Sequence, residues 1–388
     1  MKPQSCGTGC GPCAPPDQWG ASSGPRAGRP YPVSSKVAFL PGLESVRGLA
    51  AVYVVLHHIS SNFLGLQHSL IGQPFRFGLE AVLVFFVLSG FVISHATESR
   101  STMRWATYIW LRIRRIYPIA LVALLLAFVI ACIAQEEILP IDWLQFGGNL
   151  VMMQDLSNKP GVWCLPFAEN FPLWSLSYEM TFYFLYIPLM VYVARKAQLG
   201  VATALSWGGV AINQVYPNPW CNFVSFLIIW WVGVEMAREF RDRGRLSWGR
   251  QCKMAMVLFP PFAFYGYLIC KLHQAGVTSF SFAMHPVLQA RFYGETILIL
   301  LVLPLVQGTW LSRGLGRCQP LVWLGSISYA LYALHYPIIC NLPPMPGYPL
   351  AVDLGMKLVG LFALAWFVEK KFQTWLNRKT GRMSGNPR

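Results

Sequence analysis

Arg47–His58, with the sequence RGLAAVYVVLHH, is an apolar run that carries an arginine at one end and two histidines at the other. It lies in a stretch close to the roughly 20 residues that a helix needs to cross a bilayer core. On a helix Arg47 and His58 share a face, roughly 16 Å apart along the axis. Ionisable groups at such depth normally face a bundle interior or a wet cavity. A structural interpretation also stays open, with Arg47 as a membrane anchor and His58 as a helix–helix hydrogen bond.

Similar apolar runs recur along the whole chain. Of its 388 residues 55% are hydrophobic and 12% charged, whereas about a quarter are charged in soluble domains. This pattern predicts an all-α, polytopic membrane helix bundle of about ten transmembrane helices. They are expected at 46–64, 78–96, 118–135, 172–194, 200–215, 221–237, 254–271, 293–310, 320–341 and 350–368.

The net charge of +15 follows the expected topology. Most of the 31 basic residues fall in segments that lie on the inner side if the N-terminus is inside. This asymmetry is the positive-inside rule, and it predicts that both termini are cytoplasmic. The charge therefore does not indicate a nucleic-acid partner.

Three regions are expected along the chain. Residues 1–36 are rich in Pro, Gly and Ser and predict a disordered cytoplasmic tail. Residues 37–370 form the membrane domain, and 371–388 form a basic cytoplasmic tail. No stretch reads as a cleavable signal peptide, because the first apolar run begins near residue 46.

The ten cysteines show no disulfide framework of a secreted protein. Cys6, Cys10 and Cys13 have a spacing that suits a metal cluster, but no soluble domain surrounds them, and we expect no metal site. Cys164 and Cys221 both fall in expected outer loops, where either a disulfide or two free thiols is possible.

Two further segments carry polar groups into the membrane. In FPLWSLSYEMTFYFLY, residues 171–186, Glu179 lies about two helical turns from the outer face, close to the depth of His58. In LGSISYALYALHYP, residues 324–337, His335 falls in the outer third of its span. Glu179 could equally serve helix packing, and His335 could be an interfacial histidine in an aromatic belt.

A cluster of arginines precedes the third span. In YIWLRIRRIYP, residues 108–118, Arg112, Arg114 and Arg115 lie just inside the expected cytoplasmic face. Guanidinium groups suit phosphate oxygens, although basic residues also belong here by topology.

Five segments together resemble the membrane acyltransferase family 3, the polytopic bacterial O-acyltransferases, in the form that stands alone without a soluble esterase-like domain. The resemblance covers roughly residues 37–370. It depends on LESVRGLAAVYVVLHH, LVFFVLSGFVIS, RIRRIYP, PLWSLSYEMTFY and SISYALYALHYP. It implies that Arg47 and His58 are an essential pair and that Arg112, Arg114 and Arg115 bind the acyl donor.

The resemblance implies transfer of an acyl group, commonly acetyl from acetyl-CoA, to a hydroxyl of a cell-surface carbohydrate or related metabolite, with no permanently bound cofactor. We expect His58 to act as base or acyl carrier, Glu179 to orient it or stabilise the imidazolium, and His335 to form a polar wall. Arg47, together with the arginine cluster, is expected to hold the donor phosphates. The expected location is the bacterial inner membrane, as a multi-pass protein with glycan-assembly proteins as possible partners.

Two other classes stay open on the residues alone. A transporter or flippase would use buried histidine and glutamate as a proton relay. A scaffold for a glycan-assembly complex would need neither group.

Overall fold

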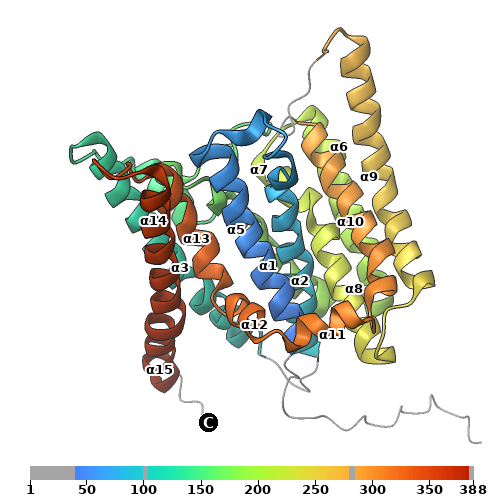
Figure 1. Ribbon diagram of the computed structural model, residues 1–388. Coiled ribbons are helices and arrows are strands. Elements are labelled where there is room, and N and C mark those ends of the chain that lie inside the picture. Colours follow the sequence, from blue (N-terminus) through green and yellow to red (C-terminus); the bar gives the residue numbers. More distant parts are fainter. Residues whose placement is uncertain (1–39, 99–103, 279–284, 384–388) are drawn as a thin grey trace, which may run out of the picture. The chain divides into compact units, whose positions relative to one another are not determined.

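The computed structural model describes residues 40–98, 104–278 and 285–383, and its ordered elements there are helices (Figure 1). The only strand-like pairing in these ranges is an isolated bridge between Gln154 and Cys164. The α-helices are α1 Pro41–His58, α2 Gly78–Glu98, α3 Trp105–Gln135, α4 Trp143–Leu150, α5 Trp174–Tyr192, α6 Arg195–Val215, α7 Pro219–Ser225, α8 Leu227–Arg243, α9 Trp248–Gln274, α10 Val287–Val306, α11 Trp310–Arg317, α12 Gln319–Gly325, α13 Ser328–Tyr336, α14 Leu350–Trp366 and α15 Gln373–Met383.

Short 3-10 and π segments join or extend these helices. The 3-10 turns are η2 Leu66–His68, η3 Gln73–Phe75, η4 Phe167–Glu169 and η5 Phe171–Leu173, and the π-helical segments are η1 Ile59–Phe63, η6 Pro337–Asn341 and η7 Phe367–Phe372. The all-α prediction is confirmed for the described residues.

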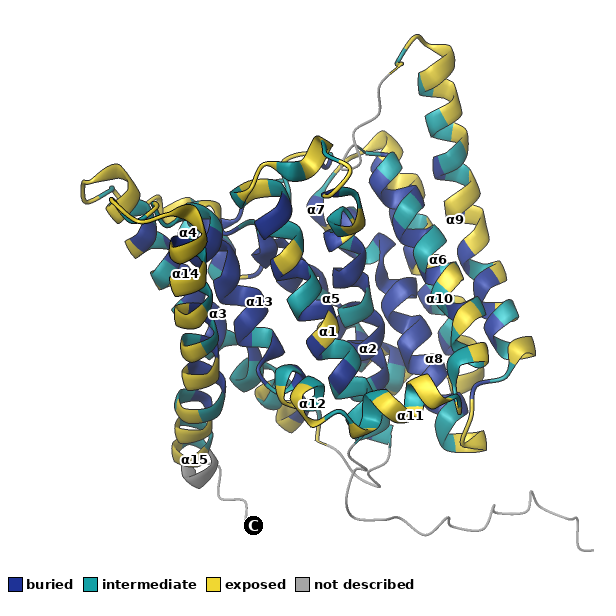
Figure 2. Cartoon of the chain, viewed as in Figure 1, coloured by how far each residue is buried: buried dark blue, intermediate teal, exposed yellow. Residues whose placement is uncertain are grey.

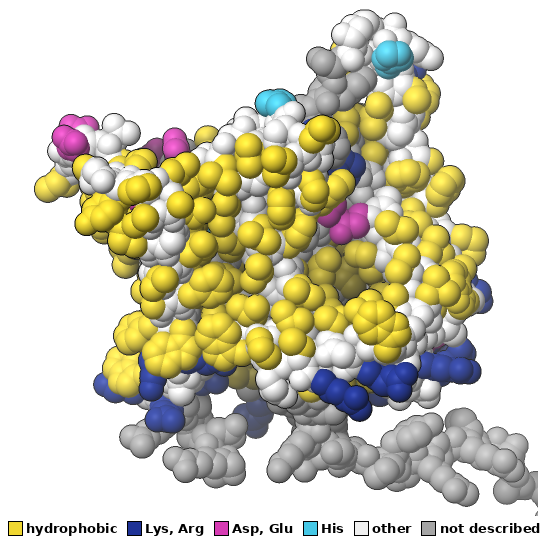
Figure 3. Space-filling view, in the orientation of Figure 1, with side chains coloured by type: hydrophobic (Ala, Val, Ile, Leu, Met, Phe, Trp, Pro, Cys, Tyr) yellow, Lys and Arg dark blue, Asp and Glu magenta, His cyan; other side chains and the backbone are white. Residues whose placement is uncertain are grey.

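Six helical segments of the described chain are long and apolar enough to cross a membrane, as befits a membrane protein. They are Gln73–Glu98, Trp105–Gln135, Pro219–Arg243, Trp248–Gln274, Val287–Val306 and Leu350–Thr380. The other four expected spans are also helical, but they carry more polar groups or, at 320–341, break into α12, α13 and η6. Ten spans and cytoplasmic termini therefore stay predictions. Figure 3 shows Lys and Arg side chains gathered along the edge that holds α11 and the end of α15.

Helix α2 packs directly against α8 through a glycine on each helix. A Cβ on Gly90 would lie 2.1 Å from the carbonyl oxygen of Trp230, and one on Gly233 would lie 2.0 Å from that of Val87. Only glycine allows such a close backbone approach. Figure 2 accordingly shows α2 and α8 mostly buried, whereas α9 and α14 carry exposed faces.

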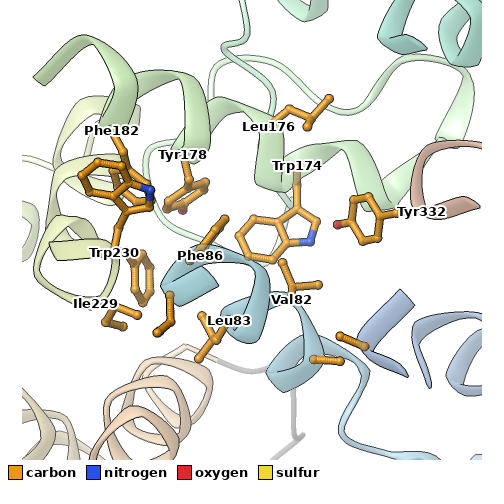
Figure 4. Packing of buried hydrophobic residues seen from close by; sticks show 14 of the residues in the cluster. Val82, Leu83, Phe86, Trp174, Leu176, Tyr178, Phe182, Ile229, Trp230 and Tyr332 are labelled. Carbon is orange, nitrogen blue, oxygen red and sulfur yellow. The ribbon is translucent and has the colours of Figure 1, made fainter. Parts of the chain in front are cut away.

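Aromatic side chains fill the space between α2, α5 and α8 (Figure 4). Phe86 of α2 lies with its ring centroid 6.0 Å from Tyr178 and 5.5 Å from Phe182, both on α5. Trp230 of α8 lies 5.9 Å from Phe182. This packing fixes the helix that carries Glu179 against the helix that carries Ser89.

Cys164 and Cys221 are both free thiols. Cys164 packs on α4, where its Sγ lies 3.4 Å from the side-chain oxygen of Gln145. Cys221 lies at the start of α7 and accepts a hydrogen bond from Asn218. Of the two alternatives the structure has the free thiols, while Cys6, Cys10 and Cys13 lie outside the described residues.

Candidate active site

A polar cavity of about 100 Å³ lies among the membrane helices. Five helices contribute to it: α1, α2, α3, α5 and α13. Its lining residues are Arg47, Val82, Phe85, Phe86, Ser89, Val92, Ile93, Arg112, Arg115, Ile116, Ser175, Leu176, Glu179, Tyr183, Ser328, Tyr329 and Tyr332. Four of the seven residues that the sequence singled out therefore face one space: Arg47, Arg112, Arg115 and Glu179.

Glu179 is held inside this cavity by hydroxyl groups. Ser89 on α2 donates to Glu179 Oε1 at 2.9 Å, and Tyr183, one turn further along α5, donates to the same oxygen. The indole N–H of Trp230 donates to Ser89 at 3.3 Å. The carboxylate is thus oriented by a chain of donors from three helices.

The arginines approach the cavity in different ways. Arg47 pairs with Glu44 one turn earlier, at 3.1 Å. The guanidinium carbon of Arg112 lies 5.8 Å from the ring centroid of Tyr108 and 5.9 Å from that of Tyr183, within cation–π range.

Arg115 and Arg114 differ in whether they line the cavity. Arg115 forms an ion pair with Glu369 of η7 and lies over Tyr329 at 5.6 Å. The side chain of Arg114 is not among the cavity-lining groups. On a helix, residues three apart lie on one face and a residue between them does not, which explains why 112 and 115 face inward together.

The two histidines meet beyond the Tyr332 end of this cavity. The ring centroids of His58 and His335 are 5.2 Å apart, and Tyr336 lies edge-on to His58 at 4.8 Å. His58 Nδ1 lies 3.3 Å from Asn62 Oδ1. The adjacent His57 points elsewhere, with Nδ1 2.6 Å from the carbonyl oxygen of Phe75.

The hydrogen bonds of His335 determine its tautomer. It is fully buried, and its Nδ1 lies 2.6 Å from the carbonyl oxygen of Tyr332. Because a carbonyl only accepts, Nδ1 carries the hydrogen in the neutral ring and Nε2 keeps its lone pair. Within the described residues Nε2 has no hydrogen-bond partner. A buried, unpaired base therefore lies beside His58.

Tyr332 connects the histidines to the cavity. Its hydroxyl donates to the carbonyl oxygen of Pro172 at 2.6 Å and lies 2.9 Å from Ser175 Oγ, while its own carbonyl binds His335. Glu179 makes no direct hydrogen bond to His58 or His335 within the described part of the chain; its partners are Ser89 and Tyr183. The structure thus brings together two groups, a histidine pair and an arginine–carboxylate cavity, joined at α13.

Sequence reasoning missed several residues of this arrangement. Asn62 lies one turn beyond His58, a spacing that could have been noticed. Ser89 lies beside Gly90 in LVFFVLSGFVIS, where a small residue is typical of close helix packing and gives no sign of a polar role. Glu369 has no local signal, because a charged residue at the inner end of a span is expected by topology. Among the described residues no group of three or more His, Cys, Asp or Glu side chains is arranged to hold a metal ion.

A family model described as an acyltransferase domain matches residues 40–342, and the chain belongs to this acyltransferase family. The acyltransferase MdmB of Streptomyces mycarofaciens is 33% identical over 168 residues, which cover 42% of this chain and 41% of that protein. The putative peptidoglycan O-acetyltransferase YrhL of Bacillus subtilis (strain 168) is 24% identical over 377 residues, which cover 87% of this chain and 55% of that protein.

The chain thus spans about half the length of these curated relatives or less. No solved structure matches it.

Proposed function

We propose that the protein is a multi-pass O-acyltransferase of the bacterial cell membrane, which moves an acetyl group from acetyl-CoA to a hydroxyl of a carbohydrate acceptor. The observation that carries the proposal is the cavity that joins Arg47, Arg112 and Arg115 to the helix of His335, beside His58. The name of the Bacillus relative, a putative peptidoglycan O-acetyltransferase, supports a glycan acceptor and an acetyl group.

The imidazoles supply the base. Nε2 of His58 takes the proton of the acceptor hydroxyl as the oxygen attacks the thioester carbonyl. The new C–O bond forms, the C–S bond breaks, and the coenzyme A thiolate receives that proton, so no net proton is produced. The neighbouring imidazole is oriented by its own Nδ1 hydrogen bond, which keeps one Nε2 lone pair available.

The arginines serve the donor. Coenzyme A carries phosphates that cannot enter the apolar membrane core, so they stay at the cytoplasmic side while the acyl end reaches inward. Arg112 and Arg115 provide guanidinium donors there, and both face the cavity. Glu179, fixed by Ser89 and Tyr183, gives the cavity a negative charge that favours a protonated imidazole during the reaction.

The test is acetyl transfer by the purified protein from labelled acetyl-CoA to carbohydrate acceptors. His58→Ala should lower turnover at least about 100-fold, the range for loss of a general base. His57→Gln is the matched control, because His57 is the adjacent imidazole and contacts the loop at Phe75; it should retain near-normal turnover. Full activity of a folded His58→Ala protein refutes the assignment. A transporter would leave acetyl-CoA unused in the same assay.

A further inference from the structure

Glu369 lies beyond the residues that the family model matches, at the inner end of the last long helix. It belongs to η7, Phe367–Phe372, a π-helical segment between α14 and α15, and is only 5% exposed. A buried carboxylate requires a reason, since an unpaired charge in the membrane is costly. π-Helical segments also occur frequently at functional sites.

The first contact of Glu369 is to the donor side of the cavity. Its carboxylate forms an ion pair with Arg115. Tyr329 holds the same guanidinium through its ring face at 5.6 Å. The Arg115 side chain stays 38% exposed, so it keeps donors available after both contacts. The pair therefore fixes the direction of Arg115 without using up its hydrogen-bonding capacity.

The second contact is to the helix of the histidine site. Glu369 Oε2 accepts the backbone N–H of Ala330 at 2.9 Å. Ala330 lies in the first turn of α13, Ser328–Tyr336, where backbone N–H groups have no partner within the helix. A carboxylate at this end also interacts favourably with the helix dipole. Glu369 thus fixes the start of the helix that carries Tyr332 and His335.

A neighbouring residue, Gln373, makes a contact that supports the position of Glu369. Gln373, one turn further on, donates from Nε2 to the carbonyl oxygen of Arg114 at 2.5 Å. This bond ties the beginning of α15 to α3 directly beside Arg115. Two neighbouring turns of the last helix are therefore attached to the arginine segment of α3.

We infer that Glu369 is a positioning residue for acyl transfer: one carboxylate oxygen orients Arg115 toward the donor and the other holds α13, so that the two ends of the cavity keep a fixed spacing. The inference rests on the proposed use of acyl-CoA. It also makes the segment after residue 342 part of the active site.

Three substitutions separate the two contacts. Glu369→Gln keeps an acceptor for the Ala330 N–H but removes the negative charge that pairs with Arg115. The KM for acetyl-CoA should therefore rise roughly tenfold, with kcat within about twofold of the wild type. Glu369→Ala loses both contacts, so KM should rise and kcat should also fall roughly tenfold. Glu369→Asp keeps the charge, so its KM for acetyl-CoA should lie between those of the wild type and Glu369→Gln.

Asp353→Asn is the matched control. Asp353 is a buried carboxylate on α14, the helix that leads into η7; it pairs with Lys357 at 3.1 Å and accepts the N–H of Met345 at 3.0 Å. Its loss should lower stability and leave the KM for acetyl-CoA unchanged. Equal KM increases in both variants would reduce Glu369 to a structural role.

Amide hydrogen exchange at Ala330 provides a readout that needs no substrate. Exchange should accelerate in Glu369→Ala and stay slow in Glu369→Gln. An unchanged or lower KM in Glu369→Gln, or unchanged exchange in Glu369→Ala, overturns the inference. A wild-type protein that cannot use acetyl-CoA instead refutes the proposed donor, and the exchange result then decides the α13 contact alone.

Discussion

Asp155→Asn should destabilise the protein strongly, because it leaves a buried ammonium without its counter-ion. Lys159 and Asp155 lie in the segment between α4 and α5, with side chains 1% and 0% exposed and Nζ 2.7 Å from Oδ1. Tyr178 of α5 completes the cluster: its hydroxyl donates to Asp155 Oδ2 at 2.7 Å and accepts from Lys159 at 2.8 Å. The Lys159 ammonium also lies 3.9 Å from the centroid of the Trp174 ring.

Removal of one partner from a buried ion pair typically costs about 3–5 kcal/mol. Asp155→Asn belongs in that range, since burial already lowers the pKa of Lys159 and Asp155 is the group that opposes this shift. Lys159→Met should cost less, about 1–3 kcal/mol, because Asp155 keeps the Tyr178 hydroxyl and the Leu156 N–H at 2.8 Å.

The measurement is urea-induced unfolding in detergent micelles, followed by tryptophan fluorescence for both single variants and the double variant. The double variant should be more stable than the sum of the single losses predicts, because each loss includes the penalty of the other unpaired charge. A cost under about 1 kcal/mol for Asp155→Asn, or strict additivity, would refute the idea that this pair holds the segment on α5.

Three further outcomes are expected. Ser89→Ala removes a donor from Glu179 and should lower kcat roughly tenfold in the acetyl-transfer assay, with unchanged thermal stability as the check on folding. Gly233→Leu should give no folded protein by size-exclusion chromatography, because its Cβ would lie 2.0 Å from a carbonyl oxygen of α2, whereas Gly266→Leu has open space and should fold. Burial lowers the pKa of His285 to about 4, so the unfolded chain binds its proton first and stability falls as pH drops from about 6.5 to 4; His285→Gln should flatten that dependence in unfolding curves.

The helical period predicted much of the cavity, and long-range contacts supplied the rest. Ser175, Glu179, Tyr183 and Tyr186 are spaced to share one face of a helix, and the first three line the cavity. Tyr186 does not line it; its hydroxyl lies 2.8 Å from Thr97 Oγ1. The same period could have separated Arg114 from its two neighbours. The ion pair of Arg115 with Glu369 could not be predicted, because it joins helices far apart in the chain and no local pattern fixes their relative rotation.

The break in the expected span at 320–341 has a different cause. The chain leaves the helix between α12 and α13 at Ser326 and Ile327, directly after Gly325, and a Gly–Ser pair is a common site of helix kinks. This break leaves the first amides of α13 without partners in their own helix. A carboxylate from a distant segment can then bind there, so the irregular point in the fold is also the point where its two polar groups are joined.

A space of about 100 Å³ has room for a few water molecules, whereas pockets for drug-sized ligands measure roughly 300–1,000 Å³. If the proposed donor and acceptor react in this cavity, a thioester arm and a sugar ring fit together only after side chains or helices move. On the proposed function, turnover would then include an opening step that admits both reactants. If that step is slower than the chemistry, the rate of opening determines kcat.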